Sequence, residues 1–473
     1  MPSTAQRKSD IVDINSEAQV ASINPATGET INHYTRESRE AANQAIEESH
    51  KAFLSWRHIK MQQRVKIITD IAAKLEESRD ELAKMMTTQM GKPLAQSQSE
   101  IDLCISICHY TAEHGPALLK DEERSSEQGD GIISYEPIGV ILAMQPWNFP
   151  LYQVVRYSIP NILAGNTTVL KHSEIVWGTA LRIQELYEAA GLPENVFRVI
   201  CVDNETADEL IGHEKVRGVT MTGSNTAGKI IAEAAGKYLK KSVLELGGSD
   251  PYIVLEDTNI DEILDACVMG RINNGGQTCI AAKRFIVVAE KYDEFKDKFV
   301  AAMSAVKYGD PLDEANQMGS MSSEDARDKL HEQVKEAIEK GATCLTGCEI
   351  PEGDGYFYPP SVLENVEPGS PAYDGELFGP VAVLFKATDE DDAVRIANDH
   401  IYGLGGGVFS SDQTRAIQVA KRIETGMVNI NGYGLARPNM PFGGVKQSGY
   451  GREHGGFGIR EFVNIKAILL PSS

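Results

Sequence analysis

The spacing of apolar residues divides the chain into an N-terminal helical part and a longer part in which strands and helices alternate. Between positions 37 and 98, apolar residues recur three and four positions apart among charged ones, as they do on one face of a helix. From Ile138 onward, short apolar runs alternate with amphipathic segments, which is typical of parallel strands joined by crossover helices. The pattern therefore predicts an α/β protein with two successive α/β units.

Apolar runs bounded by turn residues are expected to be the strands of these two units. They are Ile138–Met144, Thr167–Lys171, Val196–Val202, Val216–Thr222 and Ser242–Leu246 in the first unit, then Tyr252–Leu255, Arg284–Val288, Val381–Phe385 and Gly407–Phe409 in the second. Helices are expected between them, for example over Thr179–Ala190 and from a cap at Asn259. The pair Gly247 and Gly248 interrupts the alternation, so we expect the chain to cross between the units there.

Two further segments, Gly131–Tyr135 and Phe462–Leu470, have the pattern of edge strands. A long exposed edge strand tends to pair with another chain. We therefore expect a homodimer or homotetramer that assembles through these segments.

Charge and apolar content exclude several classes of function. The 473 residues include 46 Lys and Arg against 68 Asp and Glu, which gives a net charge of −22. Such a surface repels phosphate backbones and anionic lipids, so we expect neither nucleic-acid binding nor membrane association. No apolar run approaches the roughly 18 residues of a membrane span. The segment from Met1 to Ala21 resembles neither a signal peptide nor a transit peptide, so the chain is expected to be cytoplasmic.

The 7 cysteines are odd in number and thinly spread, which favours a reducing compartment over a disulfide framework. Cys104 and Cys108 are four positions apart, as are Cys344 and Cys348, but no paired histidines accompany them at ligand spacing. We therefore expect no metal site.

Cys279 lies in the run NNGGQTCI, which begins at Asn273. The glycines before the thiol allow a tight backbone that can bring the sulfur to a cavity, where its thiolate could attack a carbonyl carbon. Alone, the pattern is weak, because free cysteine is among the most buried residue types and often fills a core position beside a turn.

Other motifs could supply the groups that such a nucleophile needs. Residues 222–224 join an expected strand to an expected helix, where free N–H groups can hold a phosphate. Asn148, within Pro146–Pro150, could point amide donors into a cleft, and burial of Glu245 would raise its pKa toward that of a general base. Glu376 is a second acid, beside an aromatic residue in a turn. Each motif also has a structural interpretation: a capped turn, a satisfied amide, a buried or a solvated carboxylate.

Together these motifs resemble those of the aldehyde dehydrogenase superfamily over nearly the whole chain. In order, they are PWNFP at Pro146–Pro150, LKHSE at Leu170–Glu174, TGS at Thr222–Ser224, ELGG at Glu245–Gly248, GQTC at Gly276–Cys279, ELFGP at Glu376–Pro380 and PFGG at Pro441–Gly444. The resemblance implies two Rossmann-type open-sheet α/β domains plus a small β oligomerisation element. Residues 1–117, 138–246 and 430–456 would form the NAD(P)-binding domain, 247–429 the catalytic domain, and 118–137 with 457–473 the oligomerisation strands.

The resemblance also implies a role for each motif. Cys279 would attack an aldehyde, Asn148 and the Cys279 backbone N–H would hold the oxyanion, and Glu245 would activate the water that releases the acid. The positions that would bind the dinucleotide are Trp147, Asn148, Lys171, Glu174, Gly223, Ser224, Leu246, Glu376 and Phe378. Glu174 would accept hydrogen bonds from the adenosine ribose, and a carboxylate there favours NAD over the 2′-phosphate of NADP.

Around these motifs the chain is similar to the succinate-semialdehyde dehydrogenase branch, above all to its short bacterial forms. Arg156 matches the position where that branch uses arginine to hold the distal carboxylate of the substrate, although it could instead be paired within the fold. At Asn273 the chain departs from members that have a second arginine, so Arg437 could assist from another loop. Two alternatives remain open: a broad-specificity aldehyde dehydrogenase, and a catalytically retired structural or cofactor-binding protein of this fold.

Overall fold

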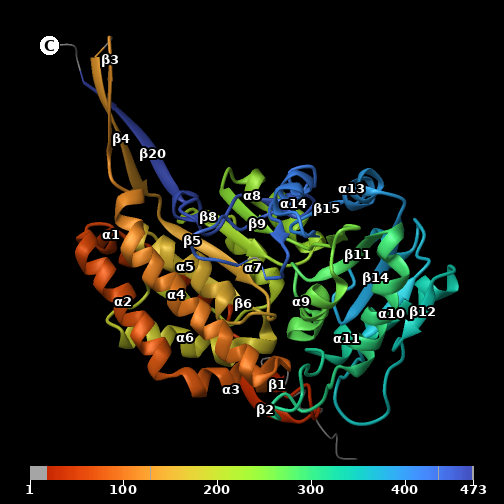
Figure 1. Cartoon of the computed structure of the whole chain (residues 1–473). Coiled ribbons are helices and arrows are strands. Elements are labelled where there is room, and N and C mark those ends of the chain that lie inside the picture. Colours follow the sequence, from red (N-terminus) through yellow and green to blue (C-terminus); the bar gives the residue numbers. More distant parts are fainter. Residues whose placement is uncertain (1–18, 128, 435, 471–473) are drawn as a thin grey trace, which may run out of the picture.

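The computed structural model describes residues 19–127, 129–434 and 436–470 (Figure 1). Most of the polar N-terminal segment, positions 1–18, lies outside the described residues, as do positions 471–473. Two large sheets, each packed against helices, make up the body, and a three-stranded sheet extends away from it. The predicted α/β class with two successive units is confirmed.

The first sheet contains the five strands predicted for it and one short antiparallel edge strand. Its order is β19 (Gly449–Tyr450), β9 (Lys241–Glu245), β8 (Val216–Thr222), β5 (Val140–Gln145), β6 (Thr167–His172) and β7 (Phe197–Val199). The prediction for β7 was too long at both ends. Side chains of β5 alternate between the two faces, so Ala143 packs in one hydrophobic core and Leu142 in the other.

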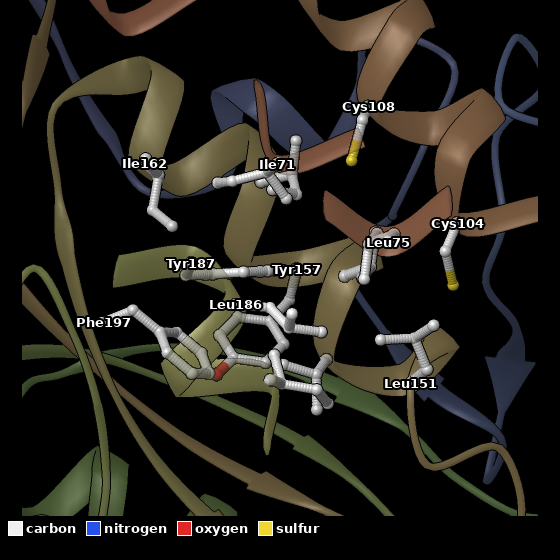
Figure 2. Close-up of a cluster of buried hydrophobic side chains, with 14 of the residues drawn as sticks. Ile71, Leu75, Cys104, Cys108, Leu151, Tyr157, Ile162, Leu186, Tyr187 and Phe197 are labelled. Atoms are coloured by element: carbon white, nitrogen blue, oxygen red, sulfur yellow. The ribbon is translucent and has the colours of Figure 1, made fainter. Parts of the chain in front are cut away.

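Helices cover both faces of this sheet. One face packs against α2 (Met61–Glu77), α3 (Arg79–Met90), α4 (Leu94–Leu118), α5 (Tyr152–Ala164) and α6 (Trp177–Ala189), and the other against α1 (Arg39–Trp56), α7 (Asn204–Leu210) and α8 (Asn225–Lys237). Figure 2 shows Cys104 and Cys108 of α4 among the apolar side chains of the first core. No helix in the described part of the chain is both long enough and apolar enough to cross a membrane.

The second sheet follows the chain crossing at Gly247 and Gly248. Its order is β12 (Thr343–Thr346), β13 (Ser361–Glu364), β14 (Val381–Ala387), β11 (Ala282–Val288), β10 (Asp250–Val254), β16 (Gly407–Phe409) and β17 (Asn429–Ile430). It packs against α9 (Ile260–Ile272) and α10 (Ala289–Ala305) on one face, and α11 (Glu324–Glu339), α13 (Glu390–Asn398) and α14 (Gln413–Ala420) on the other. As predicted, the side chain of Asn259 caps α9.

The extended sheet, here called the arm, consists of β3 (Glu122–Ser126), β4 (Gly129–Pro137) and β20 (Val463–Leu469), with β4 in the middle (Figure 1). The prediction that Gly131–Tyr135 is an edge strand is therefore wrong. β3, whose polar sequence gave no strand signal, pairs with one side of β4, and β20 pairs with the other from Val463 to Leu469. β20 itself is an edge strand, and Leu469 on it is 84% exposed.

Candidate active site

Cys279 follows a turn of unusual backbone conformation. After α9, the turn residues Asn274, Gly275 and Gly276 have φ angles of 56°, 63° and 71°, in the left-handed region. A Cβ atom on Gly276 would lie 2.4 Å from the carbonyl oxygen of Gly379, so only glycine permits this contact with the loop before β14. The run NNGGQTC therefore reflects a backbone requirement that sets the position of the thiol.

The thiol lies on the walls of two cavities. The first, of about 400 Å³, also touches Arg156 and is otherwise mainly lined by Leu103, Phe149, Tyr152, Gln153, Met269, Ile280, Tyr433 and Phe442. The second, of about 310 Å³, is lined by Pro146, Trp147, Asn148, Thr222, Gly223, Ser224, Leu246, Gly247, Glu376 and Phe378. A group bound in either cavity can thus reach the same sulfur atom.

The surroundings of Cys279 favour its neutral form. Burial raises the pKa of the thiol to about 12, although the positive charges of Lys283 and Arg156 act in the opposite direction. At neutral pH the sulfur therefore carries its proton, and a base must remove it before the sulfur can act as a nucleophile.

Asn148 connects the two turns that frame the site. Its side-chain amide donates a hydrogen bond of 3.0 Å to the carbonyl oxygen of Gln277, and the amide of Asn274 donates one of 2.7 Å to the carbonyl oxygen of Asn148. Asn148 is 3% exposed and shares the second cavity with Cys279. Because a side-chain amide has two N–H groups, it retains one that an oxyanion in this cavity could use.

A buried ion pair supports the start of α5, which follows Asn148. Lys92 and Glu100 pair with side-chain exposures of 0% and 1%. The same carboxylate accepts hydrogen bonds from the backbone N–H groups of Leu151 and Tyr152, at 2.9 and 2.8 Å. The pair had not been predicted as part of the site, because a lysine and a glutamate in a helical region are usually solvated.

Glu245, the last residue of β9, is 2% exposed. Burial raises the pKa of its carboxyl well above the usual range, while the charge of Arg156 lowers it. Among the described residues, neither of its carboxyl oxygens has a hydrogen-bond partner. A Cβ atom on Gly443, where φ is +147°, would lie 2.7 Å from its Oε1, so this glycine leaves room for the carboxylate. Glu245 lines neither cavity, so it must rotate to reach a water molecule beside Cys279.

Arg156 is buried, with an exposure of 1%. Its guanidinium pairs with Glu453, donates a hydrogen bond of 2.8 Å to the hydroxyl of Thr222, and lies 4.9 Å from the centroid of the Phe442 ring. Nη1 has no partner among the described residues. Arg156 therefore both belongs to an internal ion pair and lines the first cavity. Glu453, which sequence reasoning missed, is followed by His454 in the segment after PFGG.

Asn273 and Arg437, the two other positions considered for substrate binding, differ in whether they line a cavity. Asn273 lines the first cavity, whereas Arg437 is exposed and contributes to neither wall. Among the described cavity-lining residues, Arg156 thus supplies the positive charge of the first cavity.

A third space, a cleft of about 970 Å³, adjoins the second cavity. It is lined by Arg36, Met144, Pro146, Trp147, Lys171, Glu174, Asp203, Asn204, Asp208, Thr222, Gly223, Ser224 and Ile231, among others. Ser224 caps α8 and accepts a hydrogen bond from Ala227 N at 3.3 Å, so this helix begins at the cleft. Trp147, one of the positions expected to bind the dinucleotide, borders both spaces and makes an edge contact with Phe378, with ring centroids 5.9 Å apart.

Glu376 is held by Lys283, a residue that had not been singled out from the sequence. Lys283 Nζ lies 3.0 Å from Glu376 Oε1 and donates hydrogen bonds of 2.8 and 2.7 Å to the carbonyl oxygens of Thr278 and Cys279. Lys283 therefore joins the nucleophile turn to the loop that carries Glu376 and Phe378. A lysine at the start of a fully buried strand was the available signal.

The cleft and the second cavity suit a nicotinamide dinucleotide. They share Pro146, Trp147 and residues 222–224, so together they form one continuous channel that ends at Cys279. The N-terminus of α8 at Ser224 has free N–H groups that could hold a pyrophosphate, and Lys171 lines the same cleft. Leu246 and Phe378 give the second cavity apolar wall surface that suits a planar ring.

Known proteins resemble the chain over nearly its whole length. The chain is 44% identical over 452 residues to a succinate-semialdehyde dehydrogenase [NADP(+)] of Deinococcus radiodurans, covering 96% of this chain and 95% of the relative. It is 44% identical over 447 residues to a succinate semialdehyde dehydrogenase [NAD(P)+] of Escherichia coli, covering 94% and 97%. A crystal structure of succinic semialdehyde dehydrogenase from Streptococcus pyogenes with NADP+ superposes with a TM-score of 0.94 at 36% identity, covering 96% and 100%. Residues 11–468 match the model of the aldehyde dehydrogenase family, and the chain belongs to that family.

Proposed function

We propose that this protein oxidises succinic semialdehyde to the carboxylic acid with a nicotinamide dinucleotide. The observation that carries the proposal is the position of Cys279 on the walls of both cavities. An aldehyde in the first cavity and a nicotinamide in the second would meet at this sulfur. The relatives named above are succinate-semialdehyde dehydrogenases, which supports the choice of substrate.

In this mechanism, deprotonated Cys279 attacks the aldehyde carbon, and a thiohemiacetal forms. The oxyanion accepts a hydrogen bond from the side chain of Asn148 and another from the backbone N–H of Cys279. A bound nicotinamide supplies the hydride acceptor. Lys283 holds both the nucleophile turn and the loop of Glu376 in place, because it contacts the carbonyl oxygen of Cys279 and the carboxylate of Glu376.

Loss of hydride leaves a thioester on Cys279, which water must hydrolyse. Glu245 acts as the general base for this step after its carboxylate rotates from the space beside Gly443 toward the sulfur. Its raised pKa makes the carboxylate a stronger base than an ordinary glutamate. Glu245 can also accept the proton of the Cys279 thiol before the first step.

The substrate carboxylate would bind at Arg156, whose Nη1 has no partner among the described residues. A second candidate, a broad-specificity aldehyde dehydrogenase, is favoured by one observation. Glu453 already pairs with Arg156, and the rest of the first cavity wall is largely apolar and aromatic. Both candidates use the same chemistry at Cys279 and differ only at the far end of the substrate.

Four finer expectations are part of the proposal. Glu174 at the ribose favours NAD over NADP. Residues 1–117, 138–246 and 430–456 would form the NAD(P)-binding domain, which includes α8 and most of the cleft wall and shares the second cavity with the catalytic domain. Residues 247–429 would form the catalytic domain, and 118–137 with 457–473 the strands of a homodimer or homotetramer. The cytoplasmic location stays a prediction.

The test is a panel of aldehydes assayed separately with NAD and with NADP. The Cys279→Ala variant should lose dinucleotide reduction and keep its fold, whereas Cys344→Ala, at an exposed cysteine, should remain active. Retained turnover in Cys279→Ala would refute the proposal.

The Arg156→Ala variant distinguishes the two candidates. It should lower kcat/KM for succinic semialdehyde far more than for butanal, which has the same carbon chain without the carboxylate. Because this variant leaves Glu453 buried without its partner, the Arg156→Ala/Glu453→Gln double variant is measured beside it. Equal losses for both aldehydes would favour the broad-specificity enzyme.

A further inference from the structure

Glu174 does not face the dinucleotide cleft as an isolated carboxylate. Arg36, which follows the hairpin of β1 (Gln19–Ile23) and β2 (Thr30–Thr35), lies on the same wall. Its Nη2 donates a hydrogen bond of 2.9 Å to Glu174 Oε1, and the two side chains are 36% and 34% exposed. The pair is thus open to the cleft and joins segments 138 residues apart.

This contact changes the electrostatic argument about the cofactor. A carboxylate beside the ribose 2′ position repels a phosphate group when nothing neutralises it, but here an adjacent guanidinium does. Glu174 occupies one Nη2 donor of Arg36, while Nε is buried without a hydrogen-bond partner among the described residues. A guanidinium has five N–H donors, so others remain for a second anion.

Among the described residues that line the cleft, Arg36 and Lys171 are the cations, and the other charged side chains are acidic. Lys171 donates a hydrogen bond of 2.5 Å to Asn204, and Asp203 accepts one of 2.8 Å from Thr206 N at the start of α7. Glu205, Asp208 and Asp325 also line the cleft. Because anions outnumber cations there, a 2′-phosphate needs a specific cationic contact, and Arg36 is the residue paired at the ribose-discriminating position.

We propose that Arg36 binds the 2′-phosphate of NADP and pairs with Glu174 when NAD is bound, so that the enzyme accepts both dinucleotides. The inference rests on the proposed dinucleotide site and names the residue that sets its selectivity. When the phosphate enters, Glu174 gives up its contact with Arg36 and turns toward solvent.

The experiment measures binding calorimetrically, without aldehyde, using 2′,5′-ADP and ADP as probes. Arg36→Gln should weaken 2′,5′-ADP binding about tenfold or more, as expected for the loss of a charged hydrogen bond, and change ADP binding less than about twofold. Glu174→Gln should tighten 2′,5′-ADP binding. Arg36→Lys, which keeps the charge, should lie between wild type and Arg36→Gln.

Arg198→Gln is the matched control, because Arg198 pairs with Glu37 at 2.8 Å beside Arg36 but does not line the cleft. It should leave both affinities unchanged. If Arg36→Gln weakens both probes equally, or neither, the role of Arg36 is overturned while the dinucleotide site stands. If wild type binds neither probe, the dinucleotide site itself is wrong, and this inference falls with it.

Discussion

Lys92 and Glu100 form an ion pair that is almost completely shielded from solvent, and the same Glu100 carboxylate holds the first backbone N–H groups of α5. The pair lies in the helical layer, outside the motifs that identify the family. The pair nevertheless fixes the segment between Asn148 and the start of α5, the helix that carries Arg156. The geometry of both candidate active-site residues therefore depends on α4 and on the loop between α3 and α4.

Substitution of Lys92 by methionine should destabilise the protein strongly, because it leaves the Glu100 carboxylate buried and unpaired. We expect a loss of about 3–5 kcal/mol in the free energy of unfolding, measured by urea denaturation, together with a fall in kcat. The Lys92→Met/Glu100→Gln double variant should recover most of both, since the amide oxygen of the introduced glutamine would still accept the N–H groups of α5. Lys66→Met, in an exposed pair with Asp70, is the control and should cost less than about 1 kcal/mol.

Replacement of Asn148 by alanine should affect the rate more than the binding of substrate. Loss of one oxyanion donor costs about 2.7–4 kcal/mol in the transition state, so kcat should fall about 100- to 1000-fold with a small change in KM. Steady-state kinetics and a thermal melt measure the two effects. Asn43→Ala, at a partly exposed asparagine of α1 far from the cavities, should be unchanged in both. A KM effect larger than the kcat effect would argue against the oxyanion role.

The Glu245→Gln variant should still form the thioester but should hydrolyse it slowly. Without a general base the thioester hydrolyses slowly, so kcat should fall about 100- to 10,000-fold. Rapid mixing should still show a burst of reduced dinucleotide, and mass spectrometry should detect acyl-enzyme at Cys279. Glu233→Gln, at an exposed position of α8, serves as the control. Absence of both burst and adduct would assign Glu245 to the activation of the thiol instead.

Alkylation of Cys279 should depend steeply on pH. Because its pKa is raised to about 12, the thiolate fraction increases about tenfold for each pH unit below that value. In the enzyme without ligands, the rate of reaction with iodoacetamide should therefore keep rising from pH 7 to pH 10 without a plateau. Peptide mass spectrometry follows Cys279 separately from the exposed Cys344. A plateau near pH 8 would show that Cys279 has an ordinary or lowered pKa.

Sequence reasoning found the groups that lie within short motifs. Asn148, Glu245 and Cys279 became candidates because they stand at turns, strand ends and glycines, and the resemblance to the aldehyde dehydrogenases supplied their expected roles. The turn at Asn274 illustrates this, since its left-handed backbone explains the two glycines that follow. The same local signals predicted nine strands of the two large sheets, but they missed the short strands β12, β13, β17 and β19.

The supporting ion pairs could not be found in this way. Arg36 and Glu174 are 138 positions apart, and Arg156 meets Glu453 only after the C-terminal segment returns to the first sheet. The sequence around a charged residue does not show whether its side chain is solvated or forms a buried ion pair with a distant residue. The arm was misjudged for a similar reason, because β3 is polar and becomes a strand only by pairing with β4.

The arm also constrains when during synthesis the fold can be completed. β20 contains almost the last described residues, yet its partner β4 precedes the first large sheet, and Arg460 contacts Glu122 across 338 positions of the chain. During synthesis, β3 and β4 can form only a two-stranded hairpin, which is marginally stable on its own. Pairing of β20 with β4 therefore closes a long loop, and contacts between residues so far apart in sequence form slowly. Because β20 is the expected oligomerisation edge, subunits can associate through it only after Val463–Leu469 have been made.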